Sequence, residues 1–294
     1  MKKILVGLAL SGCACVAAAQ NPFQQLLRQL PVPIPGASQQ KPGTPQQPAD
    51  VPQPGLGSTS VAEEIAIGRQ LAGNLLGAVP LVKDDKLQEY VNKVGRWIAA
   101  QSERPDLNWY FGVLESNDIN AFSLPGGYIF VTKGLFATLA SESELAGVLG
   151  HEIGHVVMKH HLNVLQKSRV VGALGGLISS QVGGRGGTQD AMVQNLIGNG
   201  AQAVARGLDK DAEYEADRIG VVLAARAGYE PYGLPAFLQK LARVNNSEAG
   251  VALLFKTHPL PQDRLMTLGD SMRDTFDQYS GANSNRERFE ASMR

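Results

Sequence analysis

The feature that most constrains this chain is a five-residue run, His151-Glu152-Ile153-Gly154-His155, set in an apolar stretch. On a helix, residues four apart lie on one face and one turn apart, so both imidazoles can reach the same metal ion. Glu152 lies beside them, where its carboxylate can take a proton from a water molecule that the metal activates. The run therefore predicts a helix that carries two zinc ligands, His151 and His155, and a general base, Glu152.

A pair of solvated surface histidines is the alternative explanation of this run. The neighbouring residues Leu149, Ile153 and Val156 argue against it, because they predict a buried helix. Two histidines and a glutamate in a buried helix need partners, since unpaired polar groups are costly there. A metal ion is such a partner, and we prefer this interpretation.

A catalytic zinc site also needs a third protein ligand and one open position. In a longer form of the motif, the third ligand is a histidine six residues after the second one, and His161 has this spacing. However, Met158 stands where that form has the glycine that folds the chain back. A helix that continues through Met158 turns His160 and His161 away from His155, so we expect both to be surface residues.

Carboxylates on a second predicted helix are better candidates for the third ligand. Glu213 and Asp217 are four residues apart and share one face, whereas Glu215 points elsewhere. One of the pair can bind the metal, and the other can hydrogen-bond the free N–H of a ligand histidine. An acidic face exposed to solvent explains the same spacing. Spacing alone therefore leaves the third ligand open.

The rest of the chain predicts one mainly helical α+β domain over residues 58–276. Capping boxes that start at Ser60 and Ser141 each open a helix. A Gly-rich segment, 173–187, predicts a mobile loop or a helical hairpin near the site, and a polar tail, 277–294, ends the chain. The predicted helices are 60–76, 83–102, 141 to beyond 155, 209–227, 233–244 and 260–276, and the predicted strands are 109–115, 120–124 and 128–131.

The first residues predict an export leader that is not part of the fold. Two lysines precede an apolar run and three alanines follow it, so we expect a signal peptide over residues 1–19. The apolar run is shorter than the roughly 20 residues that span a bilayer. Residues 10–13, Leu-Ser-Gly-Cys, also resemble a bacterial lipobox, which would leave Cys13 lipidated at the new N-terminus. Residues 20–57 are rich in Pro and Gln and predict a disordered linker.

Four motifs occur in order along the predicted domain. They are Asn120-Ala121-Phe122 with Pro125-Gly126-Gly127-Tyr128-Ile129, His151-Glu152-Ile153-Gly154-His155-Val156, Glu213-Tyr214-Glu215-Ala216-Asp217-Arg218-Ile219-Gly220, and Thr257-His258-Pro259 with Arg264. Together they resemble the HtpX-like and CAAX-prenyl-protease family of zinc metallopeptidases, family forty-eight of the metallopeptidases. The resemblance covers roughly residues 60–270. It implies a zincin-like metallopeptidase domain with a small β-sheet whose edge strand borders the active site.

The resemblance implies the third zinc ligand and the role of its neighbour. In the family, the first Glu of an E-x-x-x-D motif binds zinc, and this residue is Glu213 here. One Zn²⁺ per chain would then be held by His151, His155 and Glu213. The Asp of the motif, Asp217, orients a ligand or donates a proton, and it joins Glu152 as a catalytic candidate.

The resemblance also implies a substrate strand and a further catalytic histidine. Asn120, Ala121 and Phe122 would form the edge strand, where an extended peptide can bind through main-chain hydrogen bonds. Two roles stay open for His258: it donates to the oxyanion of the tetrahedral intermediate, or it occupies the open zinc position as a fourth ligand that keeps the enzyme latent. Arg264 either supports this region or pairs with an acid.

These expectations combine into a zinc-dependent endopeptidase of the bacterial periplasm that acts on misfolded or stalled envelope proteins. The chain lacks the membrane helices of some family members and the C-terminal helical repeats of others, which argues against prenylated substrates. Protein or peptide substrates are the expected partners. Nucleic acid is not expected as a partner, because 27 basic and 27 acidic residues give no excess of positive charge that would attract its phosphates. A lipidated Cys13 or a partner complex would attach the chain to the outer membrane.

Two alternatives to this function have a physical basis. The domain could act as a periplasmic chaperone-like binding module whose proteolysis is latent. It could also be a structural metalloprotein in which the zinc coordination is closed. A fourth ligand at the metal would favour either alternative over a constantly active enzyme.

Overall fold

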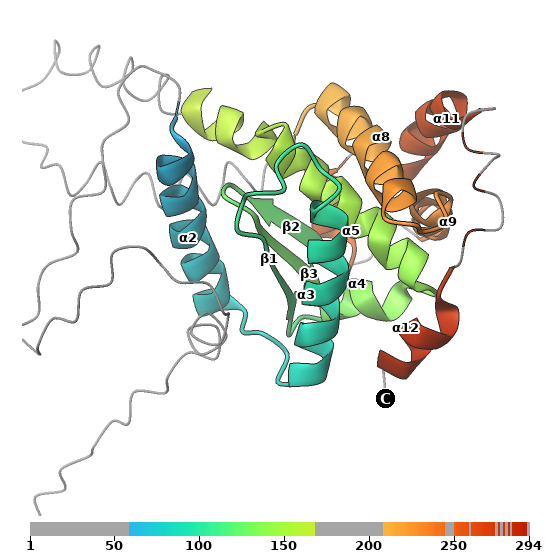
Figure 1. Cartoon of the computed structure of the whole chain (residues 1–294), viewed down its shortest axis with the longest axis horizontal. Coiled ribbons are helices and arrows are strands. Elements are labelled where there is room, and N and C mark those ends of the chain that lie inside the picture. Colours follow the sequence, from blue (N-terminus) through green and yellow to red (C-terminus); the bar gives the residue numbers. More distant parts are fainter. Residues whose placement is uncertain are drawn as a thin grey trace, which may run out of the picture. The chain divides into compact units, whose positions relative to one another are not determined.

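The structure of the chain is a computed structural model, and it describes residues 59–167, 208–244, 250–258, 260–273, 276, 279, 282 and 284–292. The predicted leader, the predicted linker and the Gly-rich segment 173–187 lie outside the described residues. Within them the domain is mainly helical and has one small mixed sheet, which confirms the predicted α+β class (Figure 1).

The described helices begin and end close to the predicted positions. Ser60 opens the first with a complete capping box, in which its hydroxyl accepts from the N–H of Glu63 and the Glu63 carboxylate accepts from the N–H of Ser60. Ser141 caps the helix that carries the five-residue run. The helices are α2 (Val61–Ala78), α3 (Asp85–Ala99), α4 (Lys133–Thr138), α5 (Glu142–Val157), α8 (Lys210–Arg226), α9 (Gly233–Leu241), α10 (Ala252–Thr257), α11 (Pro261–Met272) and α12 (Arg286–Ser292).

The sheet has three short strands in the order β1-β3-β2. β1 (Tyr110–Leu114) pairs in parallel with β3 (Tyr128–Thr132), and β2 (Ala121–Leu124) pairs antiparallel with β3. Gly126 and Gly127 form the tight connection between β2 and β3 with φ angles of +78° and +91°, a region that favours glycine. Because β2 pairs only with β3 in the described sheet, it is an edge strand, as the family resemblance implies.

Side chains of α3 close the outer edge of β1. Gln88 donates to the carbonyl of Val113 and accepts from its N–H, each at 2.9 Å. One helical turn later, Asn92 bonds the carbonyl and the N–H of Phe111 in the same way. Residues 80–82 extend this cover at one end of the strand. Among the described residues, no strand pairs with the outer edge of β2, so the described sheet is open on that side alone.

The backbones of α5 and α8 touch where the helices cross, and glycines allow this contact. A Cβ on Gly150 would lie 2.8 Å from the carbonyl oxygen of Gly220, and a Cβ on Gly220 would lie 2.7 Å from the amide nitrogen of His151. Such distances are shorter than packed atoms tolerate, so a larger residue would push the helices apart. One turn further along α5, Gly154 faces Ala216. The two helices that carry the predicted metal ligands are thus as close as their backbones permit.

The largest local difference from the prediction follows the second histidine of the motif. The expected continuation of α5 through Met158 is wrong, because the helix ends at Val157 and Lys159 has a left-handed φ of +57°. Residues with side chains rarely adopt this conformation, and no glycine signals it in the sequence. The chain turns at Lys159, and a second helical segment, 160–167, begins after the turn.

The C-terminal tail also differs from its predicted polar character. α12 inserts Phe289 into the core, where the side chain is fully buried and its ring centroid lies 5.0 Å from that of Phe136. Arg288 of the same helix forms an ion pair with the buried carboxylate of Glu142. One phenylalanine among charged residues has no helical periodicity, so the sequence does not predict this helix. The short helices α4 and α10 are not predicted either.

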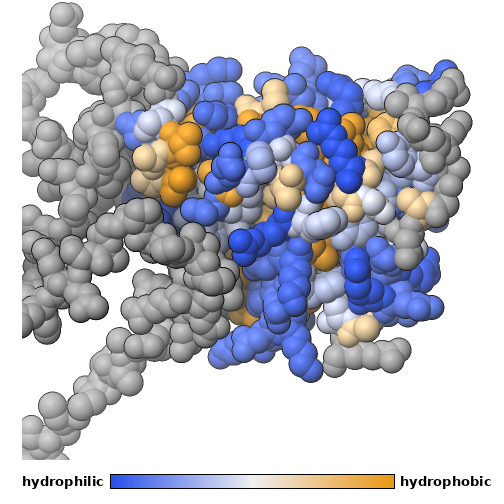
Figure 2. All heavy atoms as spheres, in the orientation of Figure 1, coloured by the Kyte–Doolittle hydropathy of each residue, from blue (hydrophilic) through white to orange (hydrophobic). Residues whose placement is uncertain are grey.

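Polar residues cover most of the described surface on the face shown in Figure 2, and hydrophobic residues there form separate patches. The large apolar side chains that are exposed are spread over different parts of the chain: Val61, Trp97, Met158, Leu260, Met266 and Tyr279. None of the described helices is both long enough and apolar enough to cross a lipid bilayer.

Candidate metal centre

α5 places His151 and His155 one turn apart on a buried face, as the motif predicts. Their Nε2 atoms lie 3.0 Å apart, and both side chains are almost fully buried. Glu152 follows His151 on the same helix and is buried as well. Helical geometry thus brings two imidazoles to one point with a carboxylate beside them.

α8 brings Glu213 to the same point. Its Oε2 lies 3.6 Å from Nε2 of His151, and its Oε1 lies 3.5 Å from Nε2 of His155. Glu213 has no exposed surface, and its Oε1 has no hydrogen-bond partner. Because a buried carboxylate oxygen without a partner is costly, this atom indicates a place for a cation.

His258, at the end of α10, completes a group of four. Its Nδ1 lies 2.7 Å from Oε2 of Glu213, and its side chain is 9% exposed. One ligand atom from each of His151, His155, Glu213 and His258 lies within 4.8 Å of the others. His258 therefore lies at the candidate site, as both of its predicted roles require.

Asp217 and Arg264 hold the other side of His151. Oδ1 of Asp217 lies 2.9 Å from Nδ1 of His151, and the two carboxylate oxygens accept from the buried Arg264 guanidinium at 2.6 and 2.9 Å. Arg264 also lies 3.3 Å from the same imidazole nitrogen, but Asp217 is nearer and can only accept. We therefore assign the proton to Nδ1 of His151, which leaves a lone pair on the Nε2 that faces Glu213.

Burial and neighbouring charges favour the deprotonated forms of His155, Glu213 and Asp217, whereas at His258 the charge and hydrogen bond of Glu213 outweigh burial and raise the pKa. Burial lowers the pKa of His155 well below its usual value. Burial raises the pKa of Glu213, but the charge and the hydrogen bond of His258 outweigh it and leave that pKa below its usual value. Burial likewise opposes ionisation of Asp217, and Arg264 outweighs it, so the pKa of Asp217 is lowered too. Metal ligands bind in these deprotonated forms.

The donor set fits a divalent metal ion. Two imidazole nitrogens and a carboxylate oxygen are donors that zinc takes in catalytic sites. The Nε2 lone pairs of His151 and His155 face each other at 3.0 Å and would repel each other without a cation. The same cation would satisfy the Glu213 oxygen that has no other partner.

His160 and Glu215 lie next to the candidate site, which the sequence does not predict. Nδ1 of His160 lies 2.9 Å from Nδ1 of His155, and Nε2 of His160 lies 3.1 Å from Oε2 of Glu215. The expectation that His160 and His161 are surface residues is wrong, since both are half-buried and burial lowers the pKa of His161 to about 4. The physical reason is the left-handed turn at Lys159, which leads the chain back towards the motif.

The predicted substrate residues lie on the edge strand, which contacts α5. Asn120 directly precedes β2, and Ala121 and Phe122 begin it. Asn120 is almost fully buried, and its Oδ1 accepts from the N–H of Ala121. Its Nδ2 has no hydrogen-bond partner, and neither has Oγ of Ser123. Two polar groups on this strand are thus left unsatisfied.

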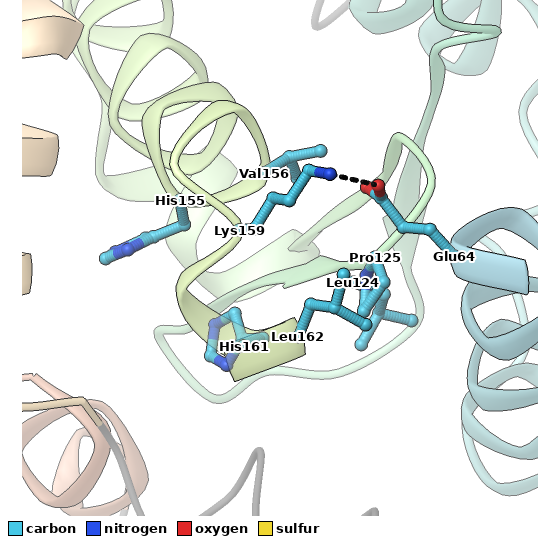
Figure 3. Close-up of a pocket in the computed structure, with 8 residues that line it drawn as sticks. All are labelled: Glu64, Leu124, Pro125, His155, Val156, Lys159, His161 and Leu162. Atoms are coloured by element: carbon cyan, nitrogen blue, oxygen red, sulfur yellow. Dashed lines mark ion pairs between the residues drawn. The ribbon is translucent and has the colours of Figure 1, made fainter. Parts of the chain in front are cut away.

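A narrow hollow lies between α2, the end of β2 and the turn after α5 (Figure 3). In Figure 3 the side chain of His155 points away from the hollow, and Lys159 reaches towards Glu64, with 3.7 Å between Nζ and Oε2. The hollow is therefore next to the metal centre without containing it. The residues that line it are Glu64, Leu124, Pro125, His155, Val156, Lys159, His161 and Leu162.

Known proteins are similar to this chain over the same region. The sequence pattern of peptidase family M48 matches residues 85–271. The beta-barrel assembly-enhancing protease of Escherichia coli (strain K12) is 31% identical over 216 residues, which are 71% of this chain and 44% of that protein. The mitochondrial metalloendopeptidase OMA1 of Schizosaccharomyces pombe is 29% identical over 65% of this chain and 56% of that protein. Metalloprotease LoiP of Escherichia coli is 29% identical over 55% of this chain and 62% of that protein.

These similarities agree with the geometry of the site. The chain spans less than half the length of the beta-barrel assembly-enhancing proteases that it matches. The matched region nevertheless contains the edge strand, the two helices that carry His151, His155 and Glu213, and His258. The chain therefore belongs to peptidase family M48, the metallopeptidase family whose motifs its sequence resembles.

Proposed function

We propose that this chain is a zinc-dependent endopeptidase that acts on misfolded or stalled proteins of the cell envelope. The observation that carries the proposal is the buried cluster of His151, His155 and Glu213, in which one Glu213 oxygen lacks any partner. One Zn²⁺ per chain, held by these three residues, would leave a fourth position for water and substrate.

Each of the residues around the cluster has a different role in hydrolysis. When bound, the ion supplies Lewis acidity, which polarises the scissile carbonyl and lowers the pKa of water. Glu152 takes the proton of the attacking water and passes it to the leaving amine. Asp217 accepts hydrogen bonds from both His151 and Arg264 and has a lowered pKa, so it has no proton to donate at neutral pH. We therefore assign Asp217 the orienting role and not that of proton donor.

The edge strand β2 suits the binding of an extended peptide. α3 closes the opposite edge of the described sheet, so a peptide can add beside β2 but not beside β1. Main-chain pairing along this strand would favour extended, unfolded substrates with little side-chain preference.

The proposed compartment and substrates rest on the leader and the relatives. A signal peptide over 1–19 and a linker over 20–57 would deliver the catalytic domain, 58–276 together with α12, to the periplasm. One relative is named a beta-barrel assembly-enhancing protease, which supports outer-membrane proteins among the substrates. A lipidated Cys13 or a partner complex would hold the enzyme at the outer membrane.

Removal of the metal should abolish proteolysis. A chelator should stop digestion of casein by the purified chain, and one equivalent of Zn²⁺ should restore it. Stability should fall as well, because an ion present at about 1,000 times its Kd contributes about 4 kcal/mol to the folded state. Metal analysis, casein digestion and thermal unfolding measure these effects. Cleavage that survives complete removal of the metal would contradict the proposal.

Of the two roles open to His258, we propose that of fourth ligand, which would give the enzyme a latent state. A ligand atom of His258 lies within the same 4.8 Å cluster as the other three ligands. A histidine in the open position would exclude substrate until it withdraws. In this latent state the enzyme would behave like the chaperone-like module or the closed structural site, because none of the three would cleave a substrate.

His258→Ala should therefore raise kcat/KM for casein. If His258 caps the site in about nine molecules of ten, its removal should increase kcat/KM about tenfold, since apparent activity scales with the competent fraction. Zinc content should stay at one per chain, because three ligands remain. A fall in activity would support the oxyanion role instead. No chelator-sensitive cleavage in either protein would favour the binding module or the closed structural site.

A further inference from the structure

We propose that His160, held by Glu215, is a positioning residue that fixes the tautomer and the ring orientation of the ligand His155. The inference rests on the proposed metal centre and adds two residues to it. Nδ1 of His160 lies 2.9 Å from Nδ1 of His155, and Nε2 of His160 lies 3.1 Å from the Glu215 carboxylate. The side chain of His160 is 10% exposed, so its contact with the buried His155 has little competition from water, whereas the Glu215 side chain is 39% exposed.

The carboxylate of Glu215 places every proton in this chain of contacts. An ionised carboxylate can only accept, so Nε2 of His160 must donate to Glu215. Nδ1 of a neutral His160 is then an acceptor, and it takes the proton on Nδ1 of His155. This assignment leaves the lone pair of His155 on Nε2, the atom that lies 3.5 Å from Glu213 and 3.0 Å from Nε2 of His151. The chain of hydrogen bonds therefore selects the tautomer that can bind metal.

The arrangement repeats, over a longer path, what Asp217 does for His151. Nδ1 of His151 bonds directly to Asp217, whereas Nδ1 of His155 reaches Glu215 through His160. Both carboxylates come from α8, the helix that also carries the third ligand. Each ligand histidine is thus oriented from α8 through the ring nitrogen that does not face the metal position.

The turn that delivers His160 is contacted by side chains gathered around the buried carboxylate of Glu64. Lys159 has a φ of +57°, a conformation that is strained for a residue with a side chain and persists only where its surroundings impose it. Arg104 donates to the carbonyl of Val156, at the end of α5, and pairs with Glu64 at 2.8 Å. Glu64 in turn lies 3.7 Å from Nζ of Lys159 (Figure 3). The strained turn is therefore contacted from two sides, and its consequence is the position of His160.

Zinc affinity of the purified full-length chain tests this role. The metal-free protein is titrated with Zn²⁺ against a chromogenic chelator of known affinity, and its unfolding midpoint is measured without metal. His160→Leu should bind zinc about 10–100-fold more weakly, the usual loss when a partner of a ligand histidine is removed. His160→Asn should recover part of this loss, because its Oδ1 can accept from His155 where Nδ1 of His160 did. Glu215→Leu, which removes the acceptor of His160, should fall between His160→Leu and the wild type.

His161→Leu is the matched control, because His161 is the next residue and its ring lies 5.6 Å from that of His155, while its Nδ1 has no hydrogen-bond partner. Its zinc affinity should stay within about twofold of the wild type. A His160→Leu variant that binds zinc as tightly as the wild type would overturn the inference. So would an equal loss in His161→Leu, or no recovery in His160→Asn. If His160→Leu fails to fold, Glu215→Leu decides, and unchanged zinc affinity there overturns the proposal. A wild type that binds no zinc would instead refute the metal centre itself.

Discussion

Glu152→Gln should lower kcat for casein by about 10²–10⁴-fold, the range that general acid–base catalysis contributes. Gln has nearly the same size as Glu but cannot take a proton from water, so the variant removes the proposed base and little else. Glu152 is not among the four residues whose ligand atoms cluster, so zinc content should not change. Steady-state proteolysis gives kcat, and metal analysis of the same preparation gives the zinc content.

Glu152→Asp separates loss of the base from general damage to the site. It keeps the carboxylate but withdraws it by about one carbon–carbon bond, so it should retain more activity than Glu152→Gln. Equal inactivity of the two variants with intact zinc would indicate that position matters more than basicity. Substantial cleavage by Glu152→Gln would show that another group activates the water.

Arg264→Met should destabilise the metal-free protein by about 3–5 kcal/mol. Arg264 is buried, and it gives Asp217 two charge-assisted hydrogen bonds at 2.6 and 2.9 Å. Without Arg264 the Asp217 carboxylate would stay buried with only His151 as a partner, which is the costly state of a broken buried ion pair. Urea unfolding in the presence of a chelator measures the loss without a contribution from bound metal.

The double variant Arg264→Met/Asp217→Leu tests the physical reason for that loss. Replacement of both charges by apolar side chains should recover most of the stability, because no uncompensated charge remains. Zinc affinity should nevertheless stay about 10–100-fold below that of the wild type, since Nδ1 of His151 has lost its acceptor. If the double variant is as unstable as Arg264→Met, packing and not charge explains the effect.

Local sequence signals predict the elements of this fold well, because each element has its own chemical marker. The capping box at Ser60 and the cap at Ser141 open helices where expected, and the strands lie within one residue of their predicted bounds. Helical spacing also predicts correctly that Glu213 and Asp217 share a face. It does not predict which helices pack together, and the family resemblance was needed to choose Glu213 as the third ligand.

Features that depend on distant contacts are the ones that sequence does not predict. The left-handed turn at Lys159 is contacted by Arg104 and Glu64, which are far away in the chain, and no local pattern marks it. His160 consequently looks like a surface residue when the helix is assumed to continue. Phe289 is similar, because its burial depends on a core built more than a hundred residues earlier.

The backbone contact between α5 and α8 has a consequence for which ions the centre accepts. With Gly150 and Gly220 in contact, the main chain fixes the separation of the two helices, and only the side chains of the histidines and Glu213 can adjust the distance between their donor atoms. A site with donor atoms that can move apart only slightly should select metal ions by their size. It suits an ion with bonds of about 2.0–2.1 Å to nitrogen. It should discriminate against Ca²⁺, which needs six to eight oxygens at about 2.3–2.6 Å, even where calcium is far more abundant than zinc.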